Sequence, residues 1–516
     1  MGGGATGSIS TSGGSSWRGG MDWAYASYVL LGCATLAPWN ALITAADYWE
    51  ARYPGKHTDR LATISYLPVN LVVIAAMVRC HAVVRPRLRI MSGLLGYTLA
   101  ISAVPLLDLL PASNATLAAV LLLVAACGAC DGFAQGALFG EAALLPPRFT
   151  QALVTGTAVS GVAISLLRVV TKAMLPGTEA GLRASANIYF SIAALLCGGA
   201  TLLYAQVLPR LPSVQRYRRQ ALEAALRGDE AATAVSVAAD GDHSGSVGSD
   251  GGSTPVSPWK QQQAGARMQA WAPSRSSLDV ELSYEDHPSN GWAGEQRGGG
   301  APLRQLGGGE ESAAQALLPG GQRAASDCWQ GAAAAGTADG GAAAAAAAGT
   351  SGGQHTAYSV FKLIWRLAVA NALIYVITLS IFPGVLAEDV HSAELGSWYP
   401  VALLAAFNLA DCAGKVTPGL PALRLRSPRA ILCTVAARVL FIPAFYLAAT
   451  LGGGPAVIGP LTVLLGLSNG YLTSCSMIEA PLRVPPAAAD LAGNTMVLFL
   501  ILGLCLGAAA SFLWLL

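Results

Sequence analysis

Charged residues are scarce in this sequence. Asp, Glu, Lys and Arg make up 12% of the 516 residues, whereas an ordinary soluble chain has about 25%. Apolar residues make up 53%, and they gather into runs long enough to cross a bilayer. The composition therefore excludes an ordinary soluble protein and places the chain in a membrane.

Sequence motifs of catalysis are also missing. The chain has no phosphate-binding glycine loop, nucleophile elbow or zinc-binding His/Glu helix, and no basic stripe of the kind that binds nucleic acid. Cys127 and Cys130 have a spacing found in metal sites, but no second ligand pair or nearby histidine accompanies them. We therefore expect no enzyme, cofactor, bound metal or nucleic acid.

About eleven apolar stretches have the length of a membrane span. The predicted fold is an all-α polytopic membrane protein with six spans before a long polar gap and five after it. Residues 1–22 form a disordered Gly/Ser-rich head without the basic start of a signal peptide, so the first span is retained. The bundles cover residues 23–211 and 358–516, with spans near Trp23–Ala45, Leu61–Val78, Ile90–Leu110, Thr116–Gly136, Ala152–Met174, Ile188–Leu208, Ile364–Val385, Gly396–Val416, Ala430–Leu451, Val457–Ser476 and Leu491–Leu516.

Loop charges predict the orientation. The loop "RCHAVVRPRLR" holds four arginines and no acid, which favours the cytosolic side, whereas "EDVHSAE" is acidic and has no Lys or Arg. A cytosolic N-terminus and an extracytosolic C-terminus satisfy both loops. Asn114 then begins an outer glycosylation sequon, so close to two spans that we expect it to be poorly occupied.

The gap over residues 212–357 is rich in Gly, Ala, Ser and Gln, and it predicts a disordered cytosolic loop. Arg216, Arg218 and Arg219 at its start fit the usual positive charge of a cytosolic loop, with binding of anionic lipid headgroups as an alternative.

Polar residues inside the first and fourth spans are candidates for a binding site, because they are costly in hydrocarbon unless they face a cavity or partner. Pro38 can bend the first span, and Trp39 and Asn40 offer an aromatic face and hydrogen-bonding groups; an interfacial aromatic belt is the alternative. In the fourth span Gln135 follows Asp131 by one turn. Glycines at four-residue spacing there, namely Gly128, Gly132, Gly136 and Gly140, predict close helix packing, which does not account for Gln135.

Two later spans carry charge. In the fifth span Arg168 lies deep, while Lys172 can extend its ammonium to the outer surface. In the eighth, Asn408, Asp411 and Lys415 follow at steps of three and four and share one helical face. The acid and base can neutralise each other and hold a polar solute, with a surface ion pair as the alternative. Together these residues predict a carrier or channel for a flat, uncharged, hydroxylated solute rather than an inorganic ion.

Four segments resemble the signature stretches of the equilibrative nucleoside transporter family, particularly its plant-type members. They are "LAPWNALITAADYW", "GFAQGALFGEAALLPPRFTQALVTGTAVSGVAISLLRVVTKA", "SIFPGVLAEDVHSAELGSWYPVALLAAFNLADCAGK" and "SNGYLTSCSMIEAP". The resemblance implies two bundles of the major-facilitator type that alternate between outward-open and inward-open states. It also implies nucleosides such as adenosine and uridine as substrates, and possible nucleobase transport.

The resemblance also implies roles for single residues. The substrate-site residues that it implies are Leu36, Trp39, Asn40, Ile43, Gln135, Asn408, Asp411 and Lys415, and the residues alone add Arg168. Trp39 falls on a tryptophan that lines the cavity, and Gln135 on a glutamine that hydrogen-bonds the base. Lys415 stands where the family typically has arginine, a change that matters because lysine lacks the planar fork of donors.

The family includes facilitated diffusers and proton-coupled members. We favour facilitated diffusion, because Lys415 should keep Asp411 ionised and make it a poor proton carrier. Proton symport through Asp411 or Asp131 is the alternative, and a nucleoside-sensing receptor or a sugar carrier is a more distant one. The plasma membrane is expected rather than the vacuolar membrane.

Overall fold

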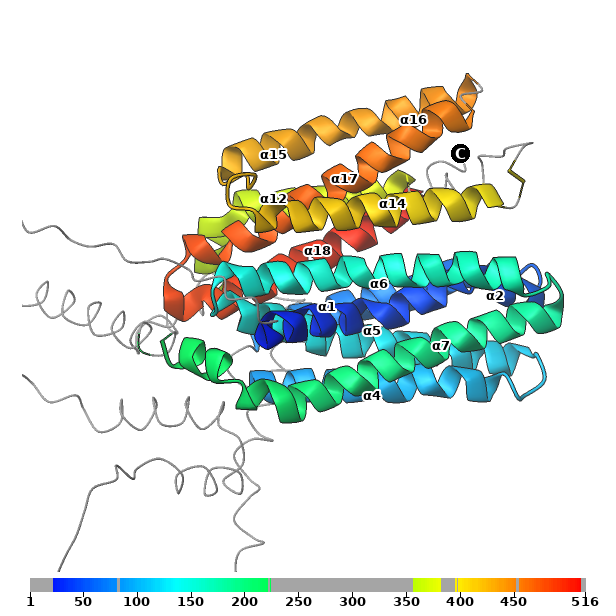
Figure 1. The fold of residues 1–516 in the computed structure, drawn as a ribbon, viewed down its shortest axis with the longest axis horizontal. Coiled ribbons are helices and arrows are strands. Elements are labelled where there is room, and N and C mark those ends of the chain that lie inside the picture. The colour runs from blue at the N-terminus through cyan, green and yellow to red at the C-terminus, as the bar shows by residue number, and fades with distance from the viewer. Residues whose placement is uncertain are drawn as a thin grey trace, which may run out of the picture.

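The structure, a computed structural model, describes residues 22–80, 84–220, 223, 356–381, 395–396, 398–451 and 454–511. All regular elements in these ranges are helices, and ten helical segments, one of them the broken run Pro428–Thr450, are long and apolar enough to cross a membrane. They run nearly parallel in two groups, with the N-terminal helices below and the C-terminal helices above in Figure 1. The predicted all-α polytopic fold is confirmed.

The N-terminal half begins at α1 and ends with a short helix over residues 212–220. Ser113 and Thr116 form a capping box at the start of α5, which satisfies N–H groups that a helix end leaves free. The elements are α1 (Trp23–Thr44), α2 (Ala46–Arg52), α3 (Thr58–Arg79), α4 (Pro86–Leu107), α5 (Asn114–Ala143), α6 (Pro147–Met174), α7 (Glu179–Leu202), the π-helix η1 (Leu203–Val207) and the 3-10 helix η2 (Leu208–Arg210).

The C-terminal half contains one broken span. Pro443 has no N–H and its ring crowds the carbonyl of residue 439, so the helix tightens into a 3-10 turn just before it. The elements are α12 (Ala357–Ile381), α14 (Trp398–Val416), η5 (Thr417–Gly419), α15 (Pro428–Ala437), η6 (Arg438–Leu440), α16 (Phe441–Thr450), α17 (Pro455–Glu479), η7 (Pro481–Arg483), η8 (Pro486–Ala488) and α18 (Ala489–Ser511).

Glycines bring helices of the same half into backbone contact. A Cβ at Gly156 of α6 would collide with the Val29 carbonyl oxygen of α1, and one at Gly470 of α17 would collide with the Asp411 carbonyl oxygen of α14. Only glycine allows two helices this close. The pairs α1/α6 and α14/α17 therefore each pack as a unit.

The predicted glycine face of α5 packs as expected. Gly128 and Gly132 lie against α3, Gly136 lies against Ile74 of α3 and Asn494 of α18, and Gly140 lies against α18, in the other half. Close helix packing is thus confirmed for this face, and α5 with α18 forms part of the contact between the halves.

The predicted span limits agree with the helices to within several residues at most ends. The predicted eighth span is α14, which has 19 residues, carries Asp411 and Lys415, and is not among the ten. The total of eleven spans and the orientation of the termini stay predictions. The acidic segment "EDVHSAE" and the head over residues 1–21 lie outside the described residues.

The start of the predicted loop differs from the expectation of disorder. Residues 212–220 form a helix, and Arg218 forms an ion pair with the buried Glu141 of α5. Tyr28 and Tyr204 also donate to this carboxylate, at 3.0 and 2.7 Å. Burial disfavours the Arg218 charge, but the nearby Glu141 outweighs it and raises the pKa of Arg218. Arg218 thus anchors the loop to the bundle, which neither loop charge nor lipid binding explains. The rest of the loop lies outside the described residues.

Candidate functional site

Four candidate residues form one stripe on α1. Leu36, Trp39, Asn40 and Ile43 are partly exposed, whereas the neighbouring Thr35, Ala37, Pro38, Ala41 and Leu42 are buried. Steps of three, one and three residues place all four on the same helical face. The face predicted to meet a solute is the accessible one.

Trp39 packs on a tyrosine of the next span. Its ring lies 4.6 Å from the ring of Tyr66 of α3, centroid to centroid, at an interplanar angle of 39°. Tyr66 is buried and its hydroxyl contacts that of Tyr97 of α4. The tryptophan is therefore held against a buried partner inside the N-terminal half.

Gln135 is buried in α5 with its amide oxygen free. The residue is 4% exposed, and Oε1 has no hydrogen-bond partner in the described part of the chain. Asp131, one turn earlier, accepts a hydrogen bond from Asn70 Nδ2 at 2.6 Å. Free buried acceptors are costly, so Gln135 Oε1 is suited to a ligand that donates.

The polar stripe of α14 lies inside the protein. Asp411 and Lys415 are each 5% exposed, and Asp411 Oδ2 lies 2.8 Å from Lys415 Nζ. Asn469 of α17 donates to Asp411 Oδ1 at 2.7 Å. This burial contradicts the alternative of a surface ion pair.

Hydroxyl groups of α6 accept hydrogen bonds from candidate residues of both halves. Asn40 of α1 donates to Ser160 Oγ at 3.0 Å, and Asn408 of α14 donates to Ser165 Oγ at 2.6 Å. Lys415 Nζ reaches Thr157 Oγ1 at 3.4 Å. At about 100° per residue, Ser160 and Ser165 lie roughly 140° apart around α6, so the three hydroxyls spread over one broad side of the helix. The α6 stripe, as we call Thr157, Ser160 and Ser165, is where the predicted residues of α1 and α14 meet.

A buried arginine lies behind Asp411. Arg438 is 3% exposed at the break between α15 and α16, and it donates to Thr378 Oγ1 at 2.9 Å. Thr378 in turn donates to Asn469 Oδ1 at 2.9 Å. A continuous chain of hydrogen bonds therefore runs from Arg438 through Thr378 and Asn469 to Asp411, which fixes the carboxylate in place.

Arg168 has different partners. Its guanidinium donates to the Thr44 carbonyl at 2.7 Å and to Asp47 Oδ2 at 2.9 Å, at the junction of α1 and α2. Lys172 Nζ lies 5.6 Å from the centre of the Trp398 ring of α14. The structure thus brings Arg168 to the end of α1 and not to Gln135 or Asp411.

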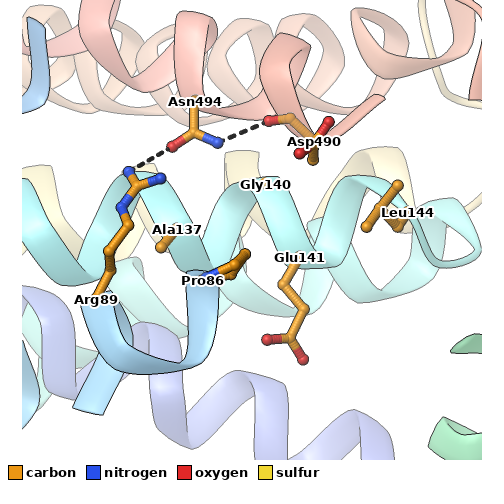
Figure 2. Close-up of a pocket in the computed structure, with 8 residues that line it drawn as sticks. All are labelled: Pro86, Arg89, Ala137, Gly140, Glu141, Leu144, Asp490 and Asn494. Atoms are coloured by element: carbon orange, nitrogen blue, oxygen red, sulfur yellow. Dashed lines mark hydrogen bonds between the residues drawn. The ribbon is translucent and has the colours of Figure 1, made fainter. Parts of the chain in front are cut away.

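A small pocket lies between the halves at the opposite end of the molecule. Figure 2 shows the buried Arg89 of α4 pointing to Asn494 of α18, and the guanidinium donates to Asn494 Oδ1 at 2.9 Å. Asn494 Nδ2 donates to the Asp490 carbonyl at 2.8 Å. The Arg89–Asn494 bond and a bond from Gln151 of α6 to the Lys415 carbonyl, at 3.3 Å, join the halves at the predicted cytosolic end.

Several site residues were not predicted. The α6 stripe, Tyr66 and Arg438 are visible only in the structure, although a lone arginine inside an apolar span was a signal for the last. Asn469 lies in the polar segment "SNGYLTSCSMIEAP", in which no single residue had been given a role. No group of three or more metal-binding side chains occurs in the described ranges. The site is thus an arrangement of aromatic, amide and hydroxyl groups with one ion pair.

Two helical bundles that meet across buried polar residues define a membrane transporter. The fold is similar to that of the proton:xylose symporter XylE of the major facilitator superfamily, with a TM-score of 0.51 and 11% identity over 95% of this chain and 86% of that one. This likeness shows the fold alone.

Sequence comparison identifies the family. The model for the nucleoside transporter family matches residues 121–268 and 337–516. Equilibrative nucleotide transporter 1 of Arabidopsis thaliana is 30% identical over 95% of this chain and 86% of its own length. Equilibrative nucleotide transporter 8 of the same plant is 29% identical over 95% of both chains. The chain belongs to the nucleoside transporter family, is a multi-pass membrane transporter, and has transporters rather than enzymes as relatives.

Proposed function

We propose that this protein carries nucleosides across a membrane by alternating access, with nucleobases as further substrates. Family membership and the names of the Arabidopsis relatives support a solute of the nucleoside type. The two-bundle fold supports alternating access, in which the halves rock about a central site.

The observation that carries this proposal is the α6 stripe. It bonds Asn40 of the N-terminal half and both Asn408 and Lys415 of the C-terminal half. Side-chain hydrogen bonds of this kind can be exchanged for bonds to a solute when the halves separate. A substrate can draw the two halves together around itself only if it contacts both of them, and this site offers contacts from both.

The side chains suit the parts of a nucleoside. Trp39 offers a flat aromatic face on which a base can stack, and Gln135 Oε1 can accept from an N–H group of the base. Asn408 and the Asp411–Lys415 pair can bond ribose hydroxyls. We place Leu36 and Ile43 on the apolar wall beside Trp39, and Arg168 in support of the α1 end.

The mode of transport depends on the buried carboxylates. The contact of Asp411 with Lys415 supports facilitated diffusion, because a nearby cation keeps the Asp411 carboxylate ionised and makes it a poor proton carrier. Asp131 favours the second candidate, proton symport, because it is 2% exposed and forms no ion pair with the described residues. The plasma membrane is our proposed location, on the family resemblance.

Uptake measurements test the proposal. Cells that lack nucleoside transport should gain saturable uptake of labelled adenosine and uridine when they express the chain, and excess unlabelled nucleoside should compete where sugars do not. Trp39→Ala should lower uptake about tenfold or more through loss of stacking, whereas Trp23→Ala, the same truncation at an exposed residue of α1, should not.

The result that overturns the proposal is a protein that is present at the surface without nucleoside flux. Nucleoside binding without flux in reconstituted vesicles would indicate a receptor. Competition by sugars and not by nucleosides would indicate a different solute.

A further inference from the structure

Asp131 is a buried carboxylate that the proposed substrate contacts do not use. It is 2% exposed and lies one turn from Gln135 on α5. Its Oδ2 accepts from Asn70 of α3 at 2.6 Å, while Oδ1 has no partner in the described part of the chain. This oxygen can bind a proton, and the hydroxyls of Tyr66 and Tyr97 lie close to the carboxylate.

The groups that face Asp131 are neutral. The titratable groups that interact with it are Tyr66 of α3, Tyr97 of α4, Cys127 and Cys130 of α5, and Cys197 of α7. Phenols and thiols keep their protons at neutral pH. No Lys, Arg or His nitrogen of the described residues lies within 4.0 Å of the carboxylate, whereas Asp411 has Lys415 at 2.8 Å.

A negative charge in such surroundings is costly. Neutral donors such as Asn70 and the two tyrosines offset part of this cost, but without a cation in contact the binding of a proton removes the charge altogether. A proton also needs no cavity, so it suits a side chain that is almost completely enclosed. We propose that Asp131 is a proton-binding site whose occupancy is coupled to the binding of the transported solute.

The coupling has a short physical route on two sides. Tyr66 packs on Trp39 at 4.6 Å between ring centres and also faces Asp131, and Gln135 follows Asp131 by one helical turn. A solute stacked on Trp39 and bonded to Gln135 would thus change the packing on both sides of the carboxyl group. This step rests on the proposed function.

The transport step balances simply. A proton from water on one side forms an O–H bond with Oδ1 of Asp131. It remains on the neutral acid while the protein changes from the outward-open to the inward-open state. The O–H bond then breaks and the proton passes to water on the other side. One positive charge therefore moves with each uncharged solute. At this ratio a gradient of one pH unit can sustain up to about tenfold accumulation.

The test compares two kinds of flux in vesicles that contain the full chain. Net uptake of labelled uridine and adenosine is measured with an inward proton gradient, and exchange of labelled for unlabelled nucleoside is measured without one. The wild type should accumulate nucleoside several-fold in the gradient. Asp131→Asn should lose the accumulation, with a ratio near one, and keep exchange at every pH.

A matched control removes a different carboxylate. Asp22→Asn makes the same chemical change at an exposed residue that caps α1, and asparagine caps a helix equally well. This variant should accumulate nucleoside as the wild type does. Asp131→Glu, which retains a group that binds a proton, should recover part of the accumulation.

Two flux results overturn the proposal: accumulation that persists in Asp131→Asn, and a wild type that exchanges nucleosides but never accumulates them. The second leaves the proposed nucleoside transport intact. If the wild type carries no nucleoside, the proposed function fails by itself. Infrared difference spectra between about pH 5.5 and 7.5 then test the proton site directly: a carboxylic acid band absent from Asp131→Asn supports it, and identical spectra of the two proteins overturn it.

Discussion

Each half of the molecule buries a carboxylate beside an asparagine of a neighbouring helix, but the other groups around the two carboxylates differ. In the N-terminal half Asn70 of α3 donates to Asp131 of α5, and in the C-terminal half Asn469 of α17 donates to Asp411 of α14. Asp411 also has Lys415, whereas Asp131 has neutral neighbours. The same pair of residue types can thus hold a fixed charge in one half and a proton in the other.

The largest expected effect comes from removing the carboxylate charge in each half. Asp411→Asn strands the Lys415 ammonium in the interior, which costs about 3–5 kcal/mol, whereas Asp131→Asn strands no cation and should cost about 1 kcal/mol or less. Thermal unfolding of the two purified variants measures the difference. Equal melting temperatures would show that the halves do not differ in the way described.

A double variant sharpens this test. Adding Lys415→Gln to Asp411→Asn removes both charges, so stability should recover. Transport should be lost in both variants, because the ion pair that would bond the solute is gone. Recovery of both would mean that the pair is structural.

A smaller effect is expected from the identity of the cation. Lys415→Arg replaces a single ammonium with a planar fork of five donors, which changes the geometry of the contacts with Asp411 and with Thr157, now 2.8 and 3.4 Å from the ammonium. The KM for nucleosides should change by about tenfold or less, an amount typical of one charged hydrogen bond. Initial rates of uptake over a range of concentrations give the KM. An unchanged KM would place Lys415 outside the substrate contacts.

The smallest effects separate two serines of the α6 stripe. Ser160 bonds Asn40 within its own half, whereas Ser165 bonds Asn408 across the halves. Each alanine substitution removes one hydrogen bond, worth about 1 kcal/mol or about fivefold. Ser160→Ala should change KM and Ser165→Ala the turnover rate. The opposite pattern in transport kinetics would contradict the division between the halves.

Most of the fold could be predicted because membrane spans are long apolar runs, and Asp411 with Lys415 was found because charge is conspicuous there. The α6 stripe was not found, since hydroxyl groups are common in spans and often bond their own backbone, as Thr157 does to the Val154 carbonyl at 2.7 Å. Arg218 looked like an ordinary cytosolic charge because its partner Glu141 is distant in the sequence. Tertiary pairing of this kind leaves no local pattern.

The backbone contacts at Gly156 and Gly470 have a mechanical consequence. At each contact two helices pack backbone against backbone and move as one rigid unit, since no flexible side chain lies between them to absorb strain. A solute that pulls on α1 therefore also moves α6, and one that pulls on α14 also moves α17. A force applied at one residue of the site is thereby transmitted to the helix pair and through it to the rest of that half. A few weak bonds to a small solute are therefore enough to move a whole half of the protein.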